Sequence, residues 1–309
     1  MKIAIVGAGI AGLSCAEMLQ AGGHHVVLFD KARGAGGRMA TRRVVTVAGY
    51  VAFDHGAQYF TARDPEFASV VQGWGSAGIA APWPGAGSDA WVGTPGMSAV
   101  AKVIARPMTI HWNCLVVKIR HMDGSWFLDA VAEIPFDAVI VATPADQAAP
   151  LLVTHDPAMA AMAQACPSAP CWTAMVAFAV RLAVVDDIIR NTGIIGWAAR
   201  NSAKPGRPGI ESWVIQATAK WSRDHLEDTE ATIVDALLAA LALETATPLP
   251  SPIIRIGHRW RYARVTATHQ GCLWNATTKI GAVGDWLIAP RVESAWLSGR
   301  MLAKVILAG

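Results

Sequence analysis

Apolar positions near the N-terminus follow the spacing of a strand, then a helix, then a second strand. The first apolar run covers residues 3–8, and apolar residues at helical spacing follow over 10–20. The second run covers 25–30. The same succession returns near the C-terminus, with an apolar strand predicted at 279–285 and a helix at 292–307. Since strands that alternate with helices favour a parallel sheet covered by helices, both terminal regions predict one α/β unit.

Between these regions the pattern changes. Residues 31–63 are rich in Gly and Arg, and we interpret them as a long functional loop interrupted by one or two short strands. A helix is predicted over 64–74, because Pro65 suits a first helical turn. Strand signals at 108–120 and 126–132 flank turn residues and predict an antiparallel hairpin.

The second half of the chain combines short apolar strands with one long helix. The predicted strands and the helix, in chain order, lie at 136–144, 172–180, 193–198, 211–217, 229–245 (the helix) and 253–260. We therefore predict a doubly wound α/β domain that contains an inserted, sheet-based second domain. The predicted first domain comprises residues 1–75, 97–150 and 265–309, and the second comprises 76–96 and 151–264.

The composition suits a compact globular protein. Of the 309 residues, 53% are hydrophobic and 16% are charged, which is enough apolar material for more than one core. The net charge of +3 comes without a long block of like charges, which argues against a nucleic-acid module. The five cysteines lack metal-ligand spacing, so we expect reduced thiols, no metal site and a cytoplasmic location. No membrane span is predicted.

A glycine-rich turn, GAGIAG, lies between the first predicted strand and helix, where a Rossmann-like dinucleotide fold requires it. Gly7 permits a tight turn, Gly9 lets a pyrophosphate approach the backbone, and Gly12 permits close packing of helix and strand. The start of the helix faces the phosphates, so Ile10 and Ala11 are predicted to bind the cofactor as well.

An acidic residue and a basic, glycine-rich segment follow. Asp30 ends the next strand 18 residues after Gly12, where a carboxylate accepts hydrogen bonds from ribose hydroxyls. NAD and FAD are both bound in this way, so the next segment, KARGAGGR, has to discriminate between them. We predict cofactor contacts from Lys31, Gly37 and Arg38, since a guanidinium forks onto phosphate oxygens and glycine clears the path of the backbone. The alternative is a solvated basic loop.

Gly284 and Asp285 end the last predicted strand, directly before the last helix. We predict that Asp285 accepts a hydrogen bond from the ribityl chain of a flavin. The helix start near Val292 would then lie at the flavin N1 and O2 atoms, where its dipole stabilises negative charge. An ordinary helix cap is the competing interpretation. Val117 is a candidate for packing on the adenine, although a buried strand explains it nearly as well.

Cationic and aromatic residues alternate in the segment 258–264. On one strand, Trp260 and Tyr262 point to one face and Arg259 and Arg261 to the other. The aromatic face is suited to stacking on a nicotinamide ring, with an Arg meeting a substrate phosphate. Ordinary strand packing is the main alternative, and a single short segment argues against binding of single-stranded nucleic acid.

Several segments together resemble the renalase family, which is similar to the flavin amine oxidases: DKARGAGGRMATRR, FDHGAQYFTARDPEF, VGTPGM, HRWRYA and GDW followed by RVESAWLSG. The resemblance covers residue 1 to about 70 and 258–305, and the middle only loosely. It implies a fold like that of flavin amine oxidases and p-hydroxybenzoate hydroxylase, with FAD bound noncovalently. Cys272 does not lie in a motif for covalent flavin attachment, and we expect it to be buried.

The resemblance also implies a reaction, in which misreduced dihydro-NAD(P) isomers, the 2- or 6-dihydro forms, are oxidised to NAD(P)+ while O2 becomes H2O2. By matching motif, the segment from Asp54 to Phe60 would line the flavin and substrate region. The cofactor contacts assigned there are His55, Gly56 and Ala57, and the substrate contacts are Gln58, Tyr59, Phe60, Gly96, Trp260 and Tyr262. A dihydropyridine already holds a transferable hydride, so positioning dominates and no catalytic acid or base is predicted.

Three other functions stay open at this point. They are an FAD-dependent amine oxidase, an aromatic hydroxylase, and a module that binds a flavin or dinucleotide without turning it over. The expected partners are a small-molecule dinucleotide substrate and O2, with no nucleic acid and no membrane, and we expect a monomer. The sequence does not rank NAD against NADP forms of the substrate.

Overall fold

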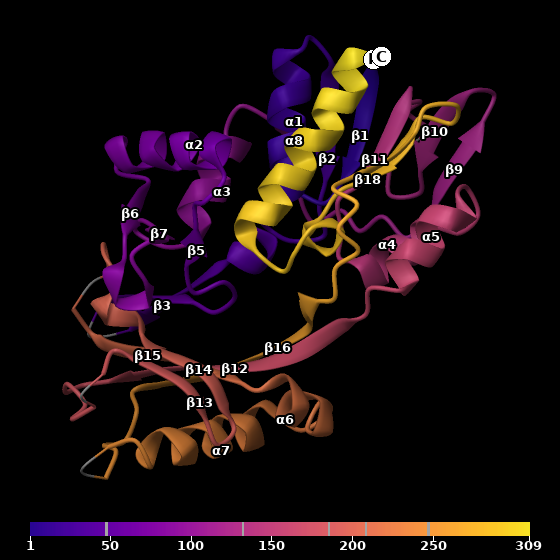
Figure 1. The fold of residues 1–309 in the computed structure, drawn as a ribbon. Helices are drawn as coiled ribbons and strands as arrows, with labels where there is room; N and C mark the ends of the chain where they lie inside the picture. Colours follow the sequence, from indigo (N-terminus) through magenta and orange to yellow (C-terminus); the bar gives the residue numbers. More distant parts are fainter. Residues whose placement is uncertain (47–48, 132, 185, 208, 246–247) are drawn as a thin grey trace. The chain divides into compact units, whose positions relative to one another are not determined.

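The computed structural model describes residues 1–46, 49–131, 133–184, 186–207, 209–245 and 248–309 (Figure 1). They form two compact units. Unit 1 comprises Met1–Gly37, Ala101–Ser168 and Val265–Gly309, and unit 2 comprises Arg38–Val100 and Ala169–Arg264. Residues 38–75, which the sequence assigns to the nucleotide-binding domain, belong to unit 2, and 151–168 belong to unit 1. Which ligand each unit binds remains a prediction.

Unit 1 is built on a six-stranded sheet with the strand order β17-β18-β11-β1-β2-β8. Neighbouring strands are parallel except for β17 with β18. The strands are β1 (Lys2–Val6), β2 (His25–Phe29), β8 (Thr109–His111), β11 (Ala138–Val141), β17 (Leu273–Asn275) and β18 (Ile280–Ala282). The central strands are apolar and buried, as in a parallel sheet covered on both faces. The predicted doubly wound fold is confirmed.

Helices cover both faces of this sheet. On one face, α1 (Ile10–Ala21) and α8 (Val292–Ala308) lie side by side (Figure 1). Ser14 Oγ donates to Trp296 O at 2.8 Å, and Gly22 lies against Leu307, so the two helices run in the same direction. The helices α4 (Ala145–Leu152) and α5 (Pro157–Gln164) share a core with alternate residues of β1, β2 and β11, which side-chain alternation places on the opposite face.

The predicted hairpin at 108–120 and 126–132 is only partly correct. The antiparallel pair is shorter and joins β9 (Ile119–Met122) to β10 (Ser125–Leu128). Thr109–His111 instead forms the edge strand β8 and pairs in parallel with β2. The difference arises because strand periodicity does not specify the partner of a strand. Residue 132 lies outside the described residues.

Unit 2 is built on a five-stranded sheet with the order β13-β14-β15-β12-β16. Its strands are β12 (Ser168–Phe178), β13 (Ile188–Thr192), β14 (Ile195–Arg200), β15 (Glu211–Ala217) and β16 (Ile254–Val265). The helix α7 (Glu230–Ala242) packs its apolar residues into a core on one face. A second core includes Val51 and Phe53 of β4 with Met175 and Val214 of the sheet. The predicted sheet-based second domain is thus confirmed as a fold.

Smaller elements complete unit 2. They are a hairpin of β3 (Thr41–Thr46) and β4 (Gly49–Asp54), a sheet of β5 (Phe60–Thr61), β7 (Ala90–Gly93) and β6 (Ala80–Pro82), and the helices α2 (Pro65–Ser76) and α6 (Ala219–Asp224). The helix α3 (Ser98–Ala105) begins in unit 2 and ends in unit 1. The described residues of the segment 31–63 therefore hold three strands, β3, β4 and β5, of which β3 and β4 pair with each other. The prediction of one or two strands was wrong.

Several local predictions can be compared with these elements. The carboxylate of Asp64 caps α2 as the sequence indicates, accepting from the backbone N–H groups of Glu66 and Phe67 at 2.9 and 3.1 Å. All five cysteines are free thiols, and Cys272, which is predicted to be buried, is half-buried. Within the part of the chain that the structure describes, no helix has the length and apolar character needed to cross a membrane.

Candidate functional site

In unit 1 the glycine-rich turn follows β1 directly. Gly7 has a φ of +112°, and a Cβ there would lie 2.8 Å from the backbone oxygen of Ala142. The Gly7 N–H donates to Phe29 O at 2.8 Å and ties the turn to the neighbouring strand. A Cβ on Gly12 would lie 2.1 Å from Gly7 O. Backbone contacts therefore leave room for no side chain at either position.

Gly9 differs from these two glycines, because an ideal Cβ built on it meets nothing within 4 Å. Gly9 also occupies the N-cap of α1 and has no side chain that could cap the helix. The first N–H groups of a helix have no partner within the helix, and open space beside them at the positive end of the helix dipole is suited to an anion. These features fit the pyrophosphate predicted beside Gly9, Ile10 and Ala11.

Asp30 follows β2 and joins three segments at the same edge of the sheet. Its Oδ2 accepts from the N–H of Ala8 and its Oδ1 from the N–H of Ala32, both at 2.7 Å. Its backbone N–H donates to His111 O, and its carbonyl accepts from the N–H of Cys114, both at 2.9 Å. Each carboxylate oxygen retains a second lone pair, so the predicted ribose contact is compatible with these bonds.

Three further residues of unit 1 are predicted to contact the cofactor. Gly37 has a φ of +50°, and a Cβ on it would lie 3.6 Å from the Cα of Gly9. Lys31 directly follows Asp30 and is exposed. Val117 is 64% exposed, whereas the adjacent Val116 belongs to the core, so Val117 is the one of the pair that a ligand can reach.

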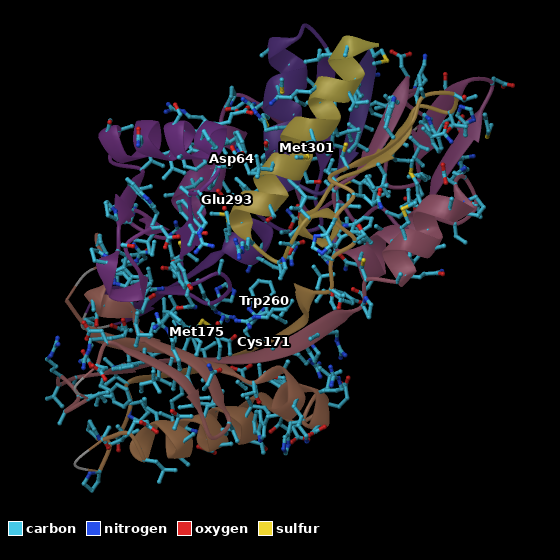
Figure 2. The ribbon with its side chains drawn as sticks, in the orientation of Figure 1. Asp64, Cys171, Met175, Trp260, Glu293 and Met301 are labelled. Carbon is cyan, nitrogen blue, oxygen red and sulfur yellow. The ribbon has the colours of Figure 1, made fainter. Side chains whose placement is uncertain are left out.

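The C-terminal segment of unit 1 reaches the same edge. Gly284 follows β18, its N–H donates to Ser298 Oγ at 3.0 Å, and a Cβ there would lie 2.6 Å from the ring of Trp286. Asp285 is buried. Glu293, which Figure 2 labels in the first turn of α8, is also buried. Because α1 and α8 run in the same direction, their N-termini point to the carboxyl edge of the sheet. Ligands of open α/β sheets bind at that edge.

In unit 2 the segment from His55 to Ala57 follows β4 and is held through its backbone. The carbonyl of Arg38 accepts from the N–H of Ala57 at 2.7 Å, and a Cβ on Gly56 would lie 2.0 Å from that carbonyl oxygen. Trp260 Nε1 donates to His55 O at 2.9 Å, and Gln216 Nε2 donates to Gly56 O at 2.7 Å. The path of this segment is therefore fixed by strands of the unit 2 sheet.

The His55 ring is buried between aromatic neighbours. It stacks on Trp260 at 5.1 Å with an interplanar angle of 28°, and His258 meets it edge-on at 4.8 Å. Burial, reinforced by His258 and Arg42, lowers the pKa of His55 to about 4, so the ring is neutral at pH 7. Its Nδ1 is buried without a hydrogen-bond partner among the described residues. A buried polar atom of this kind is suited to a ligand, which fits the predicted flavin contact.

Asp54 begins the segment that is predicted to line the flavin and substrate region, and its carboxylate pairs with two cations. Its carboxylate is fully buried and accepts from Lys204 Nζ at 3.4 Å and from Arg207 Nη2. The two cations keep the pKa of Asp54 below its usual value even though burial raises it. Burial lowers the pKa of Lys204 to about 8. Sequence reasoning identified neither cation.

Aromatic rings gather around Tyr59, which is predicted to contact the substrate. Its ring centroid lies 5.4 Å from that of Trp197 and 6.4 Å from that of Trp83. Each tryptophan ring already carries a cation, with Arg190 4.7 Å from the Trp197 ring and Lys204 5.2 Å from the Trp83 ring. Trp197 Nε1 is buried and unbonded within the described chain.

The other predicted substrate residues have different surroundings. Phe60 is 3% exposed and packs on Phe67 and Trp74 with ring centroids 6.0 and 6.5 Å apart, so its contacts are those of a core residue. Gly96 is close to Thr41, since a Cβ there would lie 2.8 Å from the Thr41 side chain. Both remain predictions as substrate contacts.

The alternating segment of β16 has two faces, as predicted. On one face, the ring centroids of His258 and Trp260 lie 4.4 Å apart. On the other, Arg259 and Arg261 both bind Glu227, at 2.6 and 2.8 Å. Glu227 thus engages the guanidinium groups that the sequence offers to a substrate phosphate. Tyr262 is half-buried.

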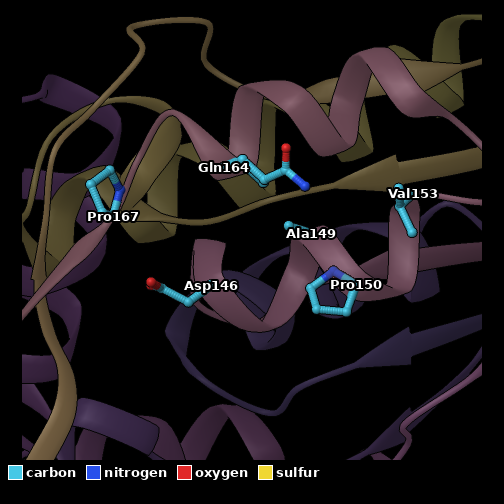
Figure 3. Close-up of a pocket in the computed structure, with 7 residues that line it drawn as sticks. Asp146, Ala149, Pro150, Val153, Gln164 and Pro167 are labelled. Atoms are coloured by element: carbon cyan, nitrogen blue, oxygen red, sulfur yellow. The ribbon is translucent and has the colours of Figure 1, made fainter.

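A cavity of about 350 Å³ also opens between α4 and α5 of unit 1 (Figure 3). Its lining is mainly apolar, with the carboxylate of Asp146 and the amide of Gln164 as polar groups. None of the residues predicted to bind cofactor or substrate lines this cavity.

The comparison with protein families gives the chain its place. A model described as a NAD(P)-binding Rossmann-like domain matches residues 5–74, and a model described as flavin containing amine oxidoreductase matches residues 84–307, well over half of the chain. The chain belongs to the flavin-containing amine oxidoreductase family. Its cofactor is accordingly FAD, and the protein is an FAD-dependent oxidoreductase.

Solved structures of similar fold agree with this assignment. A protein from Exiguobacterium sp. 255-15, provisionally named a protoporphyrinogen oxidase, superposes with a TM-score of 0.78 at 11% identity, covering 99% of this chain and 98% of the other. Cyclohexylamine oxidase from Brevibacterium oxydans IH-35A gives 0.74 at 13%, with the same coverage. Putrescine oxidase bound to putrescine gives 0.71 at 13%, covering all of both chains. At these identities the likeness extends to the fold alone.

Proposed function

We propose that this flavoprotein oxidises misreduced dihydro-NAD(P) isomers. The donor gives a hydride to FAD and leaves as NAD(P)+, and that hydride with one proton then reduces O2 to H2O2. When bound, the flavin supplies the redox chemistry. The protein has to bind the anionic dinucleotide, hold its ring in place and exclude water from it. We also propose that the protein is a monomer and acts in the cytoplasm.

The observation that carries the proposal is the charge around Tyr59. An amine substrate enters an aromatic site as a cation and is attracted to ring faces. Here Trp197 and Trp83 already have Arg190 and Lys204 on their rings, and a further cation would be repelled. A neutral dihydropyridine that carries phosphates is favoured by the same arrangement. Family membership alone does not separate the two donors.

The residues of the His55 segment have defined parts in this function. His55 stays neutral at physiological pH because its pKa is about 4, so its unbonded Nδ1 presents either an acceptor or an N–H to the flavin. Gly7, Gly9 and the N-terminus of α1 would hold the pyrophosphate, and Asp30 and Asp285 would accept from hydroxyl groups of the cofactor.

An anaerobic stopped-flow screen tests the proposal. Sodium borohydride reduction of NAD+ and NADP+ gives mixtures of dihydro isomers, and these should bleach the bound flavin within seconds, while putrescine and cyclohexylamine should leave it yellow. Bleaching by the amines alone would overturn the proposal in favour of an amine oxidase. A flavin that no donor reduces would favour a module that binds FAD without turnover.

Arg190→Gln provides a sharper test of the charge argument. Removal of this cation from the Trp197 face should raise the apparent dissociation constant for a dihydro-NAD(P) isomer about twofold to fivefold, as expected for one exposed charge–ring contact. Arg181→Gln is the matched control, since the Arg181 side chain is 72% exposed and pairs only loosely with Asp187 at 3.9 Å. Equal behaviour of the two variants would contradict the assigned role of Arg190.

A further inference from the structure

The buried charges of unit 2 lie directly behind the segment that is assigned to flavin and substrate. Asp54 ends β4 and precedes His55, and its two carboxylate oxygens have different partners. Oδ1 accepts from Thr41 Oγ1 and from the N–H of Met97, both at 2.9 Å. Oδ2 accepts from the two cations, Lys204 and Arg207. A single carboxylate thus connects β3, the loop before α3 and the segment 204–207.

A β-turn delivers both cations to the same carboxylate. The segment Lys204-Pro-Gly-Arg207 closes with a hydrogen bond from the N–H of Arg207 to Lys204 O at 3.3 Å, and Gly206 has a φ of +74°. Pro at the second position and a positive φ at the third are typical of a type II turn. The turn brings its first and fourth residues together, so both side chains reach Asp54. Arg207 Nη1 also donates to Gly93 O at 2.7 Å.

Lys204 continues from this cluster to Gln58. Its Nζ donates to Gln58 Oε1 at 3.0 Å, which turns the amide so that Gln58 Nε2 donates back to Asp54 O and to Gly56 O. The segment between Asp54 and Gln58 is thereby closed on itself around His55. Without the Lys204 contact, the Gln58 amide could turn either its NH2 group or its oxygen toward the backbone carbonyls. The NH2 group would donate to them, whereas the oxygen would be repelled.

We propose that Lys204 and Arg207 are positioning residues that fix the His55–Gln58 segment through Asp54 and Gln58. Neither touches a ligand, because both side chains are at most 1% exposed. The role goes beyond the proposed reaction and does not depend on which donor reduces the flavin. Two cations face one carboxylate here, so the cluster carries an excess positive charge. Burial of Lys204 disfavours its charged form and so reduces this excess.

The charge of Lys204 makes the role visible in solution. Its neighbours are Asp54, which favours the charged amine, Arg207, which opposes it, and the neutral Gln58 amide and Trp83 ring. With a pKa of about 8, Lys204 loses its attraction to Asp54 as the pH rises above that value. The affinity of the apo-protein for FAD should therefore fall between pH 7 and pH 9 in the unmodified protein.

The test uses Lys204→Met, Gln58→Met, the double variant and Lys220→Met as a control, since the Lys220 side chain is 86% exposed and pairs with Asp224 on the same helix. FAD dissociation constants are measured by flavin fluorescence on apo-protein, at pH 7 and pH 9. We expect about tenfold weaker binding for each single variant, no further loss in the double variant, and no pH dependence once Lys204 is replaced. Lys220→Met should behave like the unmodified protein.

Several results would overturn the positioning role. They are FAD binding by Lys204→Met that matches the unmodified protein, losses that multiply in the double variant, or a pH dependence that survives the substitution. If Lys204→Met fails to fold, Gln58→Met still decides, because it leaves the Asp54–Arg207 pair intact, and unchanged FAD binding by it refutes the inference. A chain that binds FAD as expected yet accepts no dihydro-NAD(P) isomer contradicts only the proposed function.

Discussion

Gly9 and Gly12 belong to one motif, yet the structure predicts opposite consequences for their replacement by alanine. A Cβ on Gly9 meets nothing within 4 Å, and the Gly9 φ of −74° suits any residue. A Cβ on Gly12 would lie 2.1 Å from Gly7 O, far inside van der Waals contact. Gly9→Ala should therefore leave the fold intact and place a methyl group where the pyrophosphate is expected. Gly12→Ala should strain the fold itself.

The magnitudes follow from these contacts. A hydrogen bond to a charged group contributes about 1.5–3 kcal/mol, so losing one phosphate contact in Gly9→Ala should weaken FAD binding about 10- to 100-fold. Alanine is favoured over glycine inside a helix by about 1 kcal/mol, but overpacking against backbone costs about 1–3 kcal/mol or more. Gly12→Ala should consequently lower the free energy of unfolding and reduce the melting temperature of the apo-protein by several degrees.

The assay combines thermal unfolding of the apo-protein with an FAD titration of each variant. The expected pattern is a normal melting temperature with poor FAD binding for Gly9→Ala, and a lowered melting temperature for Gly12→Ala. If Gly9→Ala retains full FAD affinity, the open space beside Gly9 does not receive the pyrophosphate. If Gly12→Ala is as stable as the unmodified protein, the close approach of α1 to the Gly7 turn has been overestimated.

Two further predictions concern unit 2. The folded pKa of His55 is about 4 against an ordinary 6.5, so the unfolded chain binds the extra proton as the pH falls between these values, and stability should decline by at most about 1.4 kcal/mol per pH unit. Urea unfolding from pH 4.5 to 7 should show a shallower decline for His55→Asn, and an unchanged slope would contradict the assignment. Arg200 is 1% exposed and pairs with Glu211 and Asp187, so Arg200→Met should cost about 3–5 kcal/mol by leaving the buried Glu211 carboxylate without a charged partner. A loss below about 1 kcal/mol in urea would show that the N–H donors from Leu182 and Trp213 suffice for Glu211.

The sequence predicts unit 1 well because its strands and motifs are local. The glycine turn, Asp30 and Gly284 each follow an apolar strand, and parallel strands bring their carboxyl ends to one edge without further information. The exception in unit 1 is the hairpin around residues 122–125, which was predicted too long, with β8 assigned to the wrong partner. Unit 2 is harder, since antiparallel strands of similar periodicity can pair in several orders.

The buried cluster around Asp54 shows a different limit. Lys204 and Arg207 lie far from Asp54 in the sequence. Lys and Arg are rarely buried, so their residue type alone predicts an exposed position. The Pro-Gly pair between them does predict a turn, but a turn does not reveal what its flanking side chains meet. Trp83 and Trp197 escape notice for the same reason, because neither belongs to a motif. Pairing between residues so far apart in the sequence becomes visible only in the folded structure.

The arrangement of α1 and α8 bears on how the protein is made. The N-terminus of a chain emerges first from the ribosome, and domains generally fold as units during synthesis. Here the partner of α1 belongs to Val265–Gly309, so its apolar face stays uncovered until nearly all of the chain has emerged. Both segments of unit 2, Arg38–Val100 and Ala169–Arg264, emerge earlier, so unit 2 can close first. Nascent protein should therefore acquire its yellow colour only after α8 has emerged, and a premature stop before residue 292 should yield colourless, chaperone-dependent product.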